Sequence, residues 1–484
     1  MAVENYTDMV KNTSWLLSAN MVSRILTAVF IILLANHLLP ADFGVYNFAF
    51  STAFIVSVIP EFGFDALTVK KVSKKPSKAP EMIADVLSLR IIFSILTVSL
   101  LWFFSTIIIY QFGMDIQFNI LLLAFLTLLF EKISGGFFAV FRAKGKMNYQ
   151  AYVIISWKII YLFLGILGIL LGFGLFKILL LLLTASIFQS ILSITFYFTN
   201  LEHSISLPNI QRWKTLIYSA YPFAVFSILS MFYGHITIVL ISILKGPSPT
   251  GLFSAGWKLI IFLGVIPHSF GRALFPFFTK LYSSKPDSVK EACVRSTRNL
   301  LQTAIPLTVI LYLLTPEIID ILFTRSYLPT VKVFRILIWM IPFLFVNGSL
   351  RMVLWSTDRT IETSKNLLYS SLSLLIFGAL LIYEFGILGA AAAVVSAEII
   401  YFITNYIKIR RTLGAIWNKD FLTISIITII SIYMMYFVQN NNLFSKYVFI
   451  ILFIPIYITT LYKLKALKKE DIYAVKSSIP FFDR

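Results

Sequence analysis

Long apolar runs separated by short polar connections dominate this chain. An α-helix rises 1.5 Å per residue, so about 20 apolar residues cross the roughly 30 Å hydrocarbon core of a bilayer. This length predicts about fourteen transmembrane helices. They lie near 13–38, 43–66, 86–110, 118–141, 149–171, 175–198, 216–243, 251–275, 298–315, 333–356, 364–383, 386–407, 421–438 and 446–462. The first run is too long for a signal peptide and follows Glu4 and Asp8, so we expect it to remain in the mature protein.

Composition and charge agree with an all-α polytopic membrane protein. Charged residues make up 13% of the 484 residues and hydrophobic residues 58%, whereas a soluble domain carries about 25% charged residues. With the N-terminus inside, 28 of the 41 lysines and arginines lie in inner connections and the tail, and 6 lie in outer connections. This asymmetry predicts that both termini are cytoplasmic, in the cell (plasma) membrane. The net charge of +19 therefore reflects topology and contact with anionic membrane lipids, and we expect no nucleic-acid partner.

An internal repeat relates the two halves of the chain. A shift of 207 residues aligns 40–67 with 247–274, and seven of these 28 positions are identical, including the triplet Val-Ile-Pro at 58–60 and 265–267. The shift equates span 1 with span 7, so both halves enter the membrane from the same side and the pseudo-twofold axis lies along the membrane normal. We expect two six-helix bundles, at 1–203 and 204–412, and two extra transmembrane helices with a basic tail at 413–484.

Two facing bundles with short loops are typical of a secondary transporter, and polar residues inside the spans are its candidate site. A charge near the bilayer centre costs at least about 2.5–3.5 kcal/mol, so it should face an aqueous cavity or a partner. Span 1 carries Asn20, Ser23, Arg24 and Thr27 on one helical face. We interpret them as lining a substrate cavity. The alternative is that backbone carbonyls or a structural ion pair satisfy Arg24.

Span 8 carries two further cations, Lys258 and Arg272, which share a broad face and lie roughly 21 Å apart along the helix axis. His268 flanks that face. The repeat places Asp65 opposite Arg272 and Glu61 opposite His268. We therefore interpret Glu61, Asp65 and His268 as an inner gate, closed by pairing of Asp65 with Arg272 across the bundle interface. The alternative is that these interfacial charges meet water.

Span 7 repeats the polar character of span 1. Ser230 and His235 join Ser227, Gly234 and Thr237 there, and we place Ser230 and His235 in the substrate cavity. His235 could couple transport to protons or be a hydrogen-bonded structural residue. Weaker intramembrane candidates are Glu131, Lys132, Lys158, Arg351, Glu384 and Glu398. The four histidines lack ligand spacing and no nucleotide-binding lysine motif is present, so we expect no cofactor and no catalytic or metal site.

The cations Arg24, Lys258 and Arg272 predict a positive cavity and hence an anionic substrate. Guanidinium groups suit phosphate because they bind it in a bidentate way. A substrate that is both anionic and lipid-tailed would explain a large cleft in a chain without a soluble receptor domain.

Four segments resemble the flippases of polysaccharides and lipid-linked oligosaccharides, within the multidrug/oligosaccharidyl-lipid/polysaccharide exporter superfamily. They are LLPADFGVYNFAFSTAFIVSVIPEFGFDALTVKKVSK, FFAVFRAKGKMNYQAY, ILKGPSPTGLFSAGWKL and PEIIDILFTRSYLPTVKVFRIL. The resemblance implies two six-helix lobes, alternating access, and movement of a prenyl-(pyro)phosphate-linked glycan from the inner to the outer leaflet. Its basic cavity residues carry over to Arg24, Lys258 and Arg272. Many relatives have Asp where this chain has His235, which leaves the ion-coupling role of that position in doubt.

Three other functions agree less well with the sequence than a flippase does. A cation-coupled multidrug antiporter of the same superfamily would need buried acids in the cleft, whereas the charges here are mostly basic. A membrane-embedded glycan polymerase or ligase would need a substantial outer catalytic loop, so we do not expect an enzyme. A scaffold of a glycan-assembly complex is disfavoured by the repeat and the buried charge. The expected partners are a lipid-linked anionic glycan and membrane lipids, with glycan-assembly enzymes as candidates.

Overall fold

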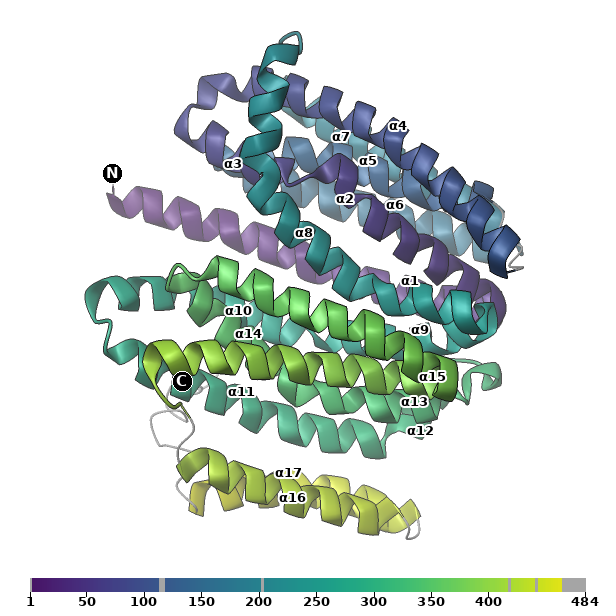
Figure 1. The fold of residues 1–484 in the computed structure, drawn as a ribbon, viewed down its shortest axis with the longest axis vertical. Coiled ribbons are helices and arrows are strands. Elements are labelled where there is room, and N and C mark those ends of the chain that lie inside the picture. Colours follow the sequence, from purple (N-terminus) through teal and green to yellow (C-terminus); the bar gives the residue numbers. More distant parts are fainter. Residues whose placement is uncertain (1, 113–117, 202–203, 417–418, 440–442, 464–484) are drawn as a thin grey trace, which may run out of the picture. The chain divides into compact units, whose positions relative to one another are not determined.

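A computed structural model describes residues 2–112, 118–201, 204–416, 419–439 and 443–463, apart from the side chains at 2–13, 108–112, 268–269, 272–273 and several positions from 419 to 445. These residues form helices and short turns, and no strand lies among them (Figure 1). The α-helices are α1 (Ala2–Val56), α2 (Val58–Glu61), α3 (Phe64–Lys74), α4 (Ala79–Phe112), α5 (Phe118–Ala143), α6 (Met147–Leu170), α7 (Leu175–Asn200), α8 (Ile210–Lys245), α9 (Pro247–Leu263), α10 (Val265–Ser284), α11 (Ser288–Leu313), α12 (Thr315–Leu322), α13 (Thr330–Leu337), α14 (Ile341–Ser356), α15 (Thr360–Leu413), α16 (Lys419–Gln439) and α17 (Leu443–Lys463). Short 3-10 turns are η1 (Pro76–Lys78), η2 (Arg325–Tyr327) and η3 (Ile338–Met340).

Contacts between residues divide the chain into two compact units. The first comprises Met1–Lys258, Leu322–Thr330 and Ser371–Ala393, and the second Leu259–Ile321, Val331–Ser370 and Val394–Arg484. The division expected from the repeat, at 1–203, 204–412 and 413–484, rests on symmetry rather than on contacts, and it stays a prediction.

The described helices confirm the all-α polytopic fold class. Ten of them are long and apolar enough to cross a membrane, or eleven if the bent pair α11 and α12 forms one span. Two of the ten, Ser14–Lys74 and Thr360–Leu413, are 61 and 54 residues long. A single transmembrane helix needs only about 20 residues. The first contains a kink at Leu39 and the second a kink at Gly386, and two helices meet at each kink. The predicted number of fourteen is therefore approximate, although each predicted span falls on helical residues.

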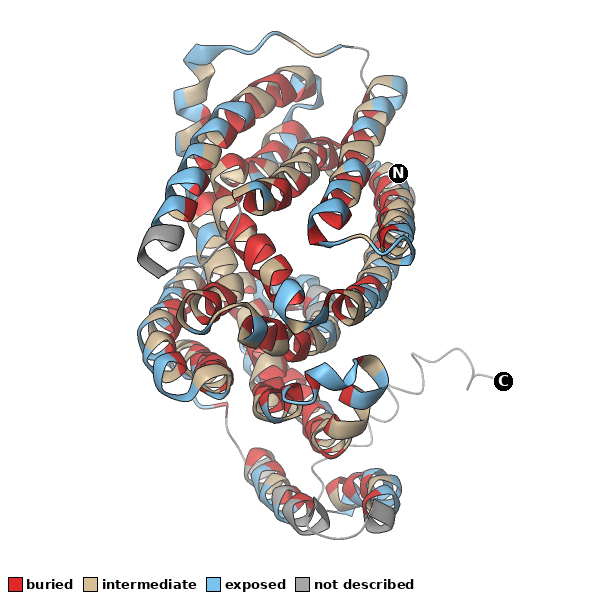
Figure 2. Cartoon of the chain, turned by 90° about the vertical axis from the view of Figure 1, so that its right-hand side faces the viewer, coloured by how far each residue is buried: buried red, intermediate tan, exposed pale blue. Residues whose placement is uncertain are grey.

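The outward faces of the helices are apolar, as lipid contact requires. On α4, for example, Ile91, Ile95, Trp102 and Phe103 are each about 60% exposed. Figure 2 shows buried and exposed residues mixed along most helices. A soluble protein does not expose contiguous apolar surface on this scale, so these faces are typical of helices surrounded by lipid.

The repeat recurs in the backbone. Leu39 has φ 61° and ψ 173°, and its equivalent Gly246 has φ 87° and ψ −176°. A second pair of breaks lies at Ser57 and Gly264, which have φ, ψ of −66°, −12° and −59°, −12° and directly precede α2 and α10. The Val-Ile-Pro triplet follows each of these two breaks. Proline has no N–H and its ring clashes with the carbonyl four residues earlier, so the helix is interrupted just before it in both halves.

The two halves of the repeat also make a matching pair of contacts with each other. A Cβ atom on Gly44 would lie 1.8 Å from the carbonyl oxygen of Pro247, and a Cβ on Gly251 would lie 1.9 Å from the carbonyl oxygen of Pro40. Because position 40 is equivalent to 247 and 44 to 251, the two contacts are reciprocal, as residues around a twofold axis must be. Reciprocal contacts of this kind agree with the pseudo-twofold repeat that the sequence predicts.

The first unit is held together by small residues and by aromatic side chains. Gly165 of α6 has no room for a side chain, because a Cβ there would lie 2.2 Å from the ring of Phe30 of α1. Glycine therefore lets α1 and α6 approach closely. Phe137 of α5 and Tyr197 of α7 meet edge to face, with ring centroids 5.3 Å apart.

The connection between α12 and α13 is anchored to α1. Asn36 donates from its side-chain nitrogen to the carbonyl of Leu322 at 2.9 Å, and its side-chain oxygen accepts the backbone N–H of Thr324 at 2.9 Å. The hydroxyl of Tyr327, in η2, donates to the carbonyl of Ala35 at 2.9 Å. Burial raises the pKa of Tyr327, so the phenol stays a donor at neutral pH.

The second unit is built around α11. Cys293 of α11 is fully buried in a cluster with Phe278 of α10 and Val353 of α14. Further along α11, Ile305 packs with residues of α16 and α17, including Ile424. The two C-terminal helices are thus attached to the unit through α11.

Candidate functional site

The polar stripe predicted on span 1 lies on α1, and two of its members are satisfied within the helix. The side-chain nitrogen of Asn20 donates to the carbonyl of Leu16 at 2.8 Å, and the hydroxyl of Thr27 donates to the carbonyl of Ser23 at 2.7 Å. Such bonds to the carbonyl four residues earlier hold the side chain against its own helix. Arg24, the charged residue of the stripe, is exposed.

His235 of α8 lies against the part of α1 that follows the kink. Its ring stacks on Phe54, with centroids 4.5 Å apart and an interplanar angle of 13°. Its Nδ1 lies 3.4 Å from the hydroxyl oxygen of Ser51, which is buried. Both contacts bring residues of spans 2 and 7 together inside the first unit.

The charge of Lys258 of α9 acts electrostatically on His235. Lys258 is the repeat equivalent of Ser51, the residue that His235 contacts. Lys258 is half-buried, and among the side chains that the structure describes no carboxylate forms an ion pair with it. An ammonium in a membrane helix without a counter-ion is costly, so the position favours an anionic ligand.

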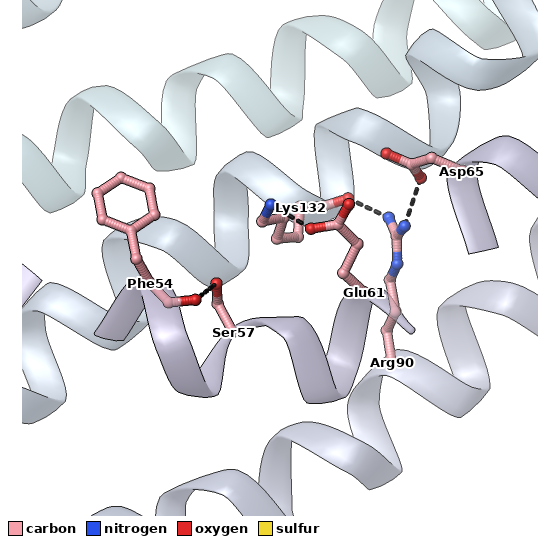
Figure 3. Close-up of polar contacts among 6 residues, drawn as sticks. All are labelled: Phe54, Ser57, Glu61, Asp65, Arg90 and Lys132. Atoms are coloured by element: carbon pink, nitrogen blue, oxygen red, sulfur yellow. Dashed lines mark hydrogen bonds and ion pairs between the residues drawn. The ribbon is translucent and has the colours of Figure 1, made fainter. Parts of the chain in front are cut away.

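The second half of span 2 is broken into α2 and α3, and ion pairs hold it to α4 and α5 (Figure 3). Glu61 forms an ion pair with Lys132 of α5. Asp65 forms an ion pair with Arg90 of α4, which also donates to the backbone carbonyl of Lys132. The Arg90 side chain is fully buried. A buried guanidinium needs such partners because losing its hydration costs several kcal/mol.

Two glycines make room for these charges. A Cβ on Gly135 would lie 2.7 Å from a carboxylate oxygen of Asp65, and a Cβ on Gly136 would lie 3.1 Å from the guanidinium of Arg90. The Gly135-Gly136 pair of α5 therefore lets side chains, rather than a neighbouring backbone, approach the helix.

The structure brings some of the predicted site residues together and not others. His235 and Lys258 share one cluster, and Ser230 is half-buried five residues earlier on α8. Glu61 and Asp65 are paired inside the first unit, with Lys132 and Arg90. Arg272 and His268 lie on α10, but their side chains are outside the part of the chain that the structure describes. The inner gate formed by Asp65 and Arg272 stays a prediction.

An aromatic setting for Lys158 was missed by the sequence reasoning. Its Nζ lies 3.9 Å from the ring centroid of Trp157 and 4.5 Å from that of Tyr161, within the range of cation–π attraction. The Glu131 carboxylate acts electrostatically on Lys158. The signal in the sequence was a Trp-Lys pair in the middle of a span, but Lys158 was ranked only among the weaker candidates.

A network of amides in the second unit was also missed. The side-chain nitrogen of Asn347 donates to Glu398 at 2.8 Å, the side-chain nitrogen of Asn405 donates to Asn347 at 3.3 Å, and that of Asn366 donates to Asn405 at 2.9 Å. All four residues are at most 3% exposed. They join α14 to both halves of α15 and have the character of a structural network.

The distribution of charge decides what the first unit can bind. Of its membrane acids, Glu61 and Asp65 form ion pairs with Lys132 and Arg90, whereas no described carboxylate forms an ion pair with Lys258. Among the residues that the structure describes, no group of three or more His, Cys, Asp or Glu side chains could hold a metal ion. The arrangement is suited to an anion.

Comparison with known proteins agrees with this fold. The sequence profile of a family described as "Polysaccharide biosynthesis protein" matches residues 9–282, and that of the MatE family matches residues 222–384. A protein named "Capsular polysaccharide biosynthesis protein CapF", from Staphylococcus aureus, is 25% identical over 420 residues, which is 83% of this chain and 100% of that protein.

Two solved structures show the same fold at low sequence identity. One is titled "Lipid II flippase MurJ, inward closed conformation". It has a TM-score of 0.75 and 17% identity, and the match covers 94% of this chain and 98% of that one. The other is an inward-facing multidrug resistance transporter of the MATE family. It has a TM-score of 0.67 and 12% identity, and the match covers 81% and 95% of the two chains.

Proposed function

The chain belongs to the polysaccharide biosynthesis protein family of the multidrug/oligosaccharidyl-lipid/polysaccharide exporter superfamily, and from this premise we propose that it is a flippase. Its substrate in this proposal is a prenyl-(pyro)phosphate-linked oligosaccharide, which it moves from the inner to the outer leaflet by alternating access. The names of the similar proteins support the substrate class, because one is a lipid II flippase and another a capsular polysaccharide biosynthesis protein.

The observation that carries the proposal is the charge of Lys258. It is half-buried in an apolar helix beside His235, and no described carboxylate pairs with it. A phosphate or pyrophosphate would supply the missing counter-charge, and the gain would be large because the surroundings are poor in water. Arg24, exposed on α1, is the second residue that we assign to the phosphate.

Alternating access would use the breaks that the repeat duplicates. The backbone is interrupted at Leu39 and Gly246 and again at Ser57 and Gly264, at equivalent places in the two halves. Helix breaks absorb changes in φ and ψ, so they are suited to act as hinges. In this proposal Glu61, Asp65, His268 and Arg272 form the gate on the inner side, and Asn20, Ser23, Thr27 and Ser230 line the cavity.

The MatE match makes a multidrug antiporter of the same superfamily the second candidate. An antiporter for cations needs acids that a substrate can reach. Glu61 and Asp65 are instead held by Lys132 and Arg90. We therefore favour the anionic substrate over the cationic one, and transport over glycan polymerisation or ligation.

Cells that lack this protein can distinguish a flippase from an enzyme of glycan synthesis. We expect glycosyl transfer to the carrier lipid to continue while the lipid-linked saccharide accumulates in the inner leaflet. Complementation with Lys258→Ala should fail, and complementation with Lys285→Ala, a change in an exposed connection, should succeed at equal expression. Loss of the glycan product without accumulation of its lipid-linked precursor would contradict a flippase.

A further inference from the structure

A basic pocket lies at one end of the first unit, away from His235 and Lys258. It has a volume of about 500 Å³ and lies between the end of α3, η1, the start of α4 and the start of α8. We call it the lysine pocket. Its lining includes Lys71, Lys74, Lys75, Lys78, Glu81, Asp85, Asn209, Gln211 and Arg212. Its volume is within the range of small-molecule sites, about 300–1,000 Å³.

The two acids of the lysine pocket share one cationic partner, Arg212, so the five cations of the lining outnumber its two carboxylates. Arg212 forms an ion pair with Glu81, and its Nε lies 2.9 Å from a carboxylate oxygen of Asp85. The other oxygen of Asp85 accepts the backbone N–H of Asn209 at 2.8 Å. These contacts fasten α8 to α4 and shape one wall of the pocket.

The four lysines of the pocket keep their charge for a ligand. Among the residues that the structure describes, none of the four forms an ion pair. They lie within eight residues of sequence, so their ammonium groups repel one another, and an anion that contacts several of them would remove that repulsion. Lysine is a common ligand of phosphate, which it meets as a point charge.

The surface beside the pocket is apolar and exposed, which favours a lipid over a soluble ion. Leu207 and Ile210, which flank Asn209, are 89% and 73% exposed. Two helices that line the pocket, α8 and α4, continue this apolar surface. Tyr218 of α8 is 72% exposed and Ile91 of α4 is 60% exposed. A molecule whose phosphate occupies the lysine pocket could thus lay an acyl or prenyl chain along α4 and α8.

We propose that the lysine pocket binds the phosphate of an anionic lipid headgroup in the adjacent leaflet. Basic side chains close to a membrane surface attract anionic lipid, and a pocket adds a defined place for one headgroup. The inference does not rest on the proposed function, because any anionic phospholipid meets its requirements. It adds a second anion site, on the surface of the unit.

The test measures binding of short-chain lipids to the purified full-length protein in detergent. Dihexanoyl phosphatidic acid is titrated and its dissociation constant is obtained from the shift in thermal unfolding, with dihexanoyl phosphatidylcholine and inorganic phosphate in parallel. The pocket variant is Lys74→Gln/Lys75→Gln/Lys78→Gln. The control variant, Lys280→Gln/Lys285→Gln/Lys290→Gln, removes three exposed lysines from another part of the chain.

We expect phosphatidic acid to bind the wild type and the control variant equally, and to bind the pocket variant at least about tenfold more weakly. Phosphatidylcholine should not bind at the same concentrations. An unchanged dissociation constant in the pocket variant would overturn the proposal, and so would an equal loss in the control variant. Inorganic phosphate that binds as tightly as phosphatidic acid would also overturn it, because the pocket would then be a site for the free ion.

Discussion

Gly44 and Gly251 lie where no side chain fits, and this allows a test of the symmetric contact. Alanine at either position would place a Cβ within 2 Å of a proline carbonyl oxygen, so the backbone must move. We expect Gly44→Ala and Gly251→Ala each to lower the free energy of unfolding by about 1–3 kcal/mol. Thermal unfolding in detergent measures this. Gly174→Ala is the control, because its Cβ would meet nothing within 4 Å; loss of the same size there would refute the packing argument.

We expect Lys258 to lower the stability of the folded protein, although transport requires its charge. Replacing an unpaired ammonium by a side chain of similar length and no charge removes an unfavourable burial, so Lys258→Met is expected to raise the melting temperature and to abolish transport. Both quantities can be measured on the same preparation. A structural role for Lys258 predicts the reverse, a lower melting temperature with transport retained in whatever protein stays folded.

At the scale of elements, the pair of Asp65 and Arg90 ties the broken second span to α4. Asp65→Asn leaves the buried guanidinium of Arg90 without its carboxylate, and we expect a loss of about 3 kcal/mol in unfolding free energy. Glu362→Gln breaks a more exposed pair with Lys408, in which both side chains are 27% exposed, and should cost about 1 kcal/mol or less.

Charge reversal distinguishes this pair from the predicted gate. The double variant Asp65→Arg/Arg90→Asp should recover part of the stability that Asp65→Arg loses, whereas Asp65→Arg/Arg272→Asp should not. Recovery of stability by the second double variant alone would show that the partner of Asp65 is Arg272. Recovery of transport but not stability by that variant would assign their pairing to a transient state of the gate.

Sequence reasoning succeeded where physical rules act locally along the chain. Spans follow from apolar length, and the repeat follows from positions such as Pro60 and Pro267, whose missing N–H groups break both halves at the same place. It did not predict which charges meet. Asp65 and Arg90 lie 25 residues apart on different helices, and only tertiary packing, with room made by Gly136, brings them together. Arg90 was not among the candidate site residues.

At the scale of the whole molecule, the orientation in the membrane stays a prediction from charge. The single cysteine, Cys293, is buried, so a Cys293→Ala background accepts new labelling sites. Cysteine introduced at Lys285 should react with an impermeant maleimide only from the cytoplasmic side, and cysteine at Lys177 only from the outside. Labelling with the opposite sidedness would invert the topology and place the lysine pocket in the outer leaflet.

The proposed function requires that an anionic lipid-linked saccharide crosses the membrane through this protein. The direct measurement uses proteoliposomes that contain a fluorescent prenyl-pyrophosphate-linked sugar, with a membrane-impermeant quencher added from outside. We expect quenching to proceed beyond the outer leaflet only when protein is present, and to stop with Arg24→Ala or Lys258→Ala. The opposite result has two parts. Quenching would stop at the outer leaflet although folded wild-type protein is present, and a soluble organic cation would move only when the protein is present. This result would contradict the flippase and support the antiporter.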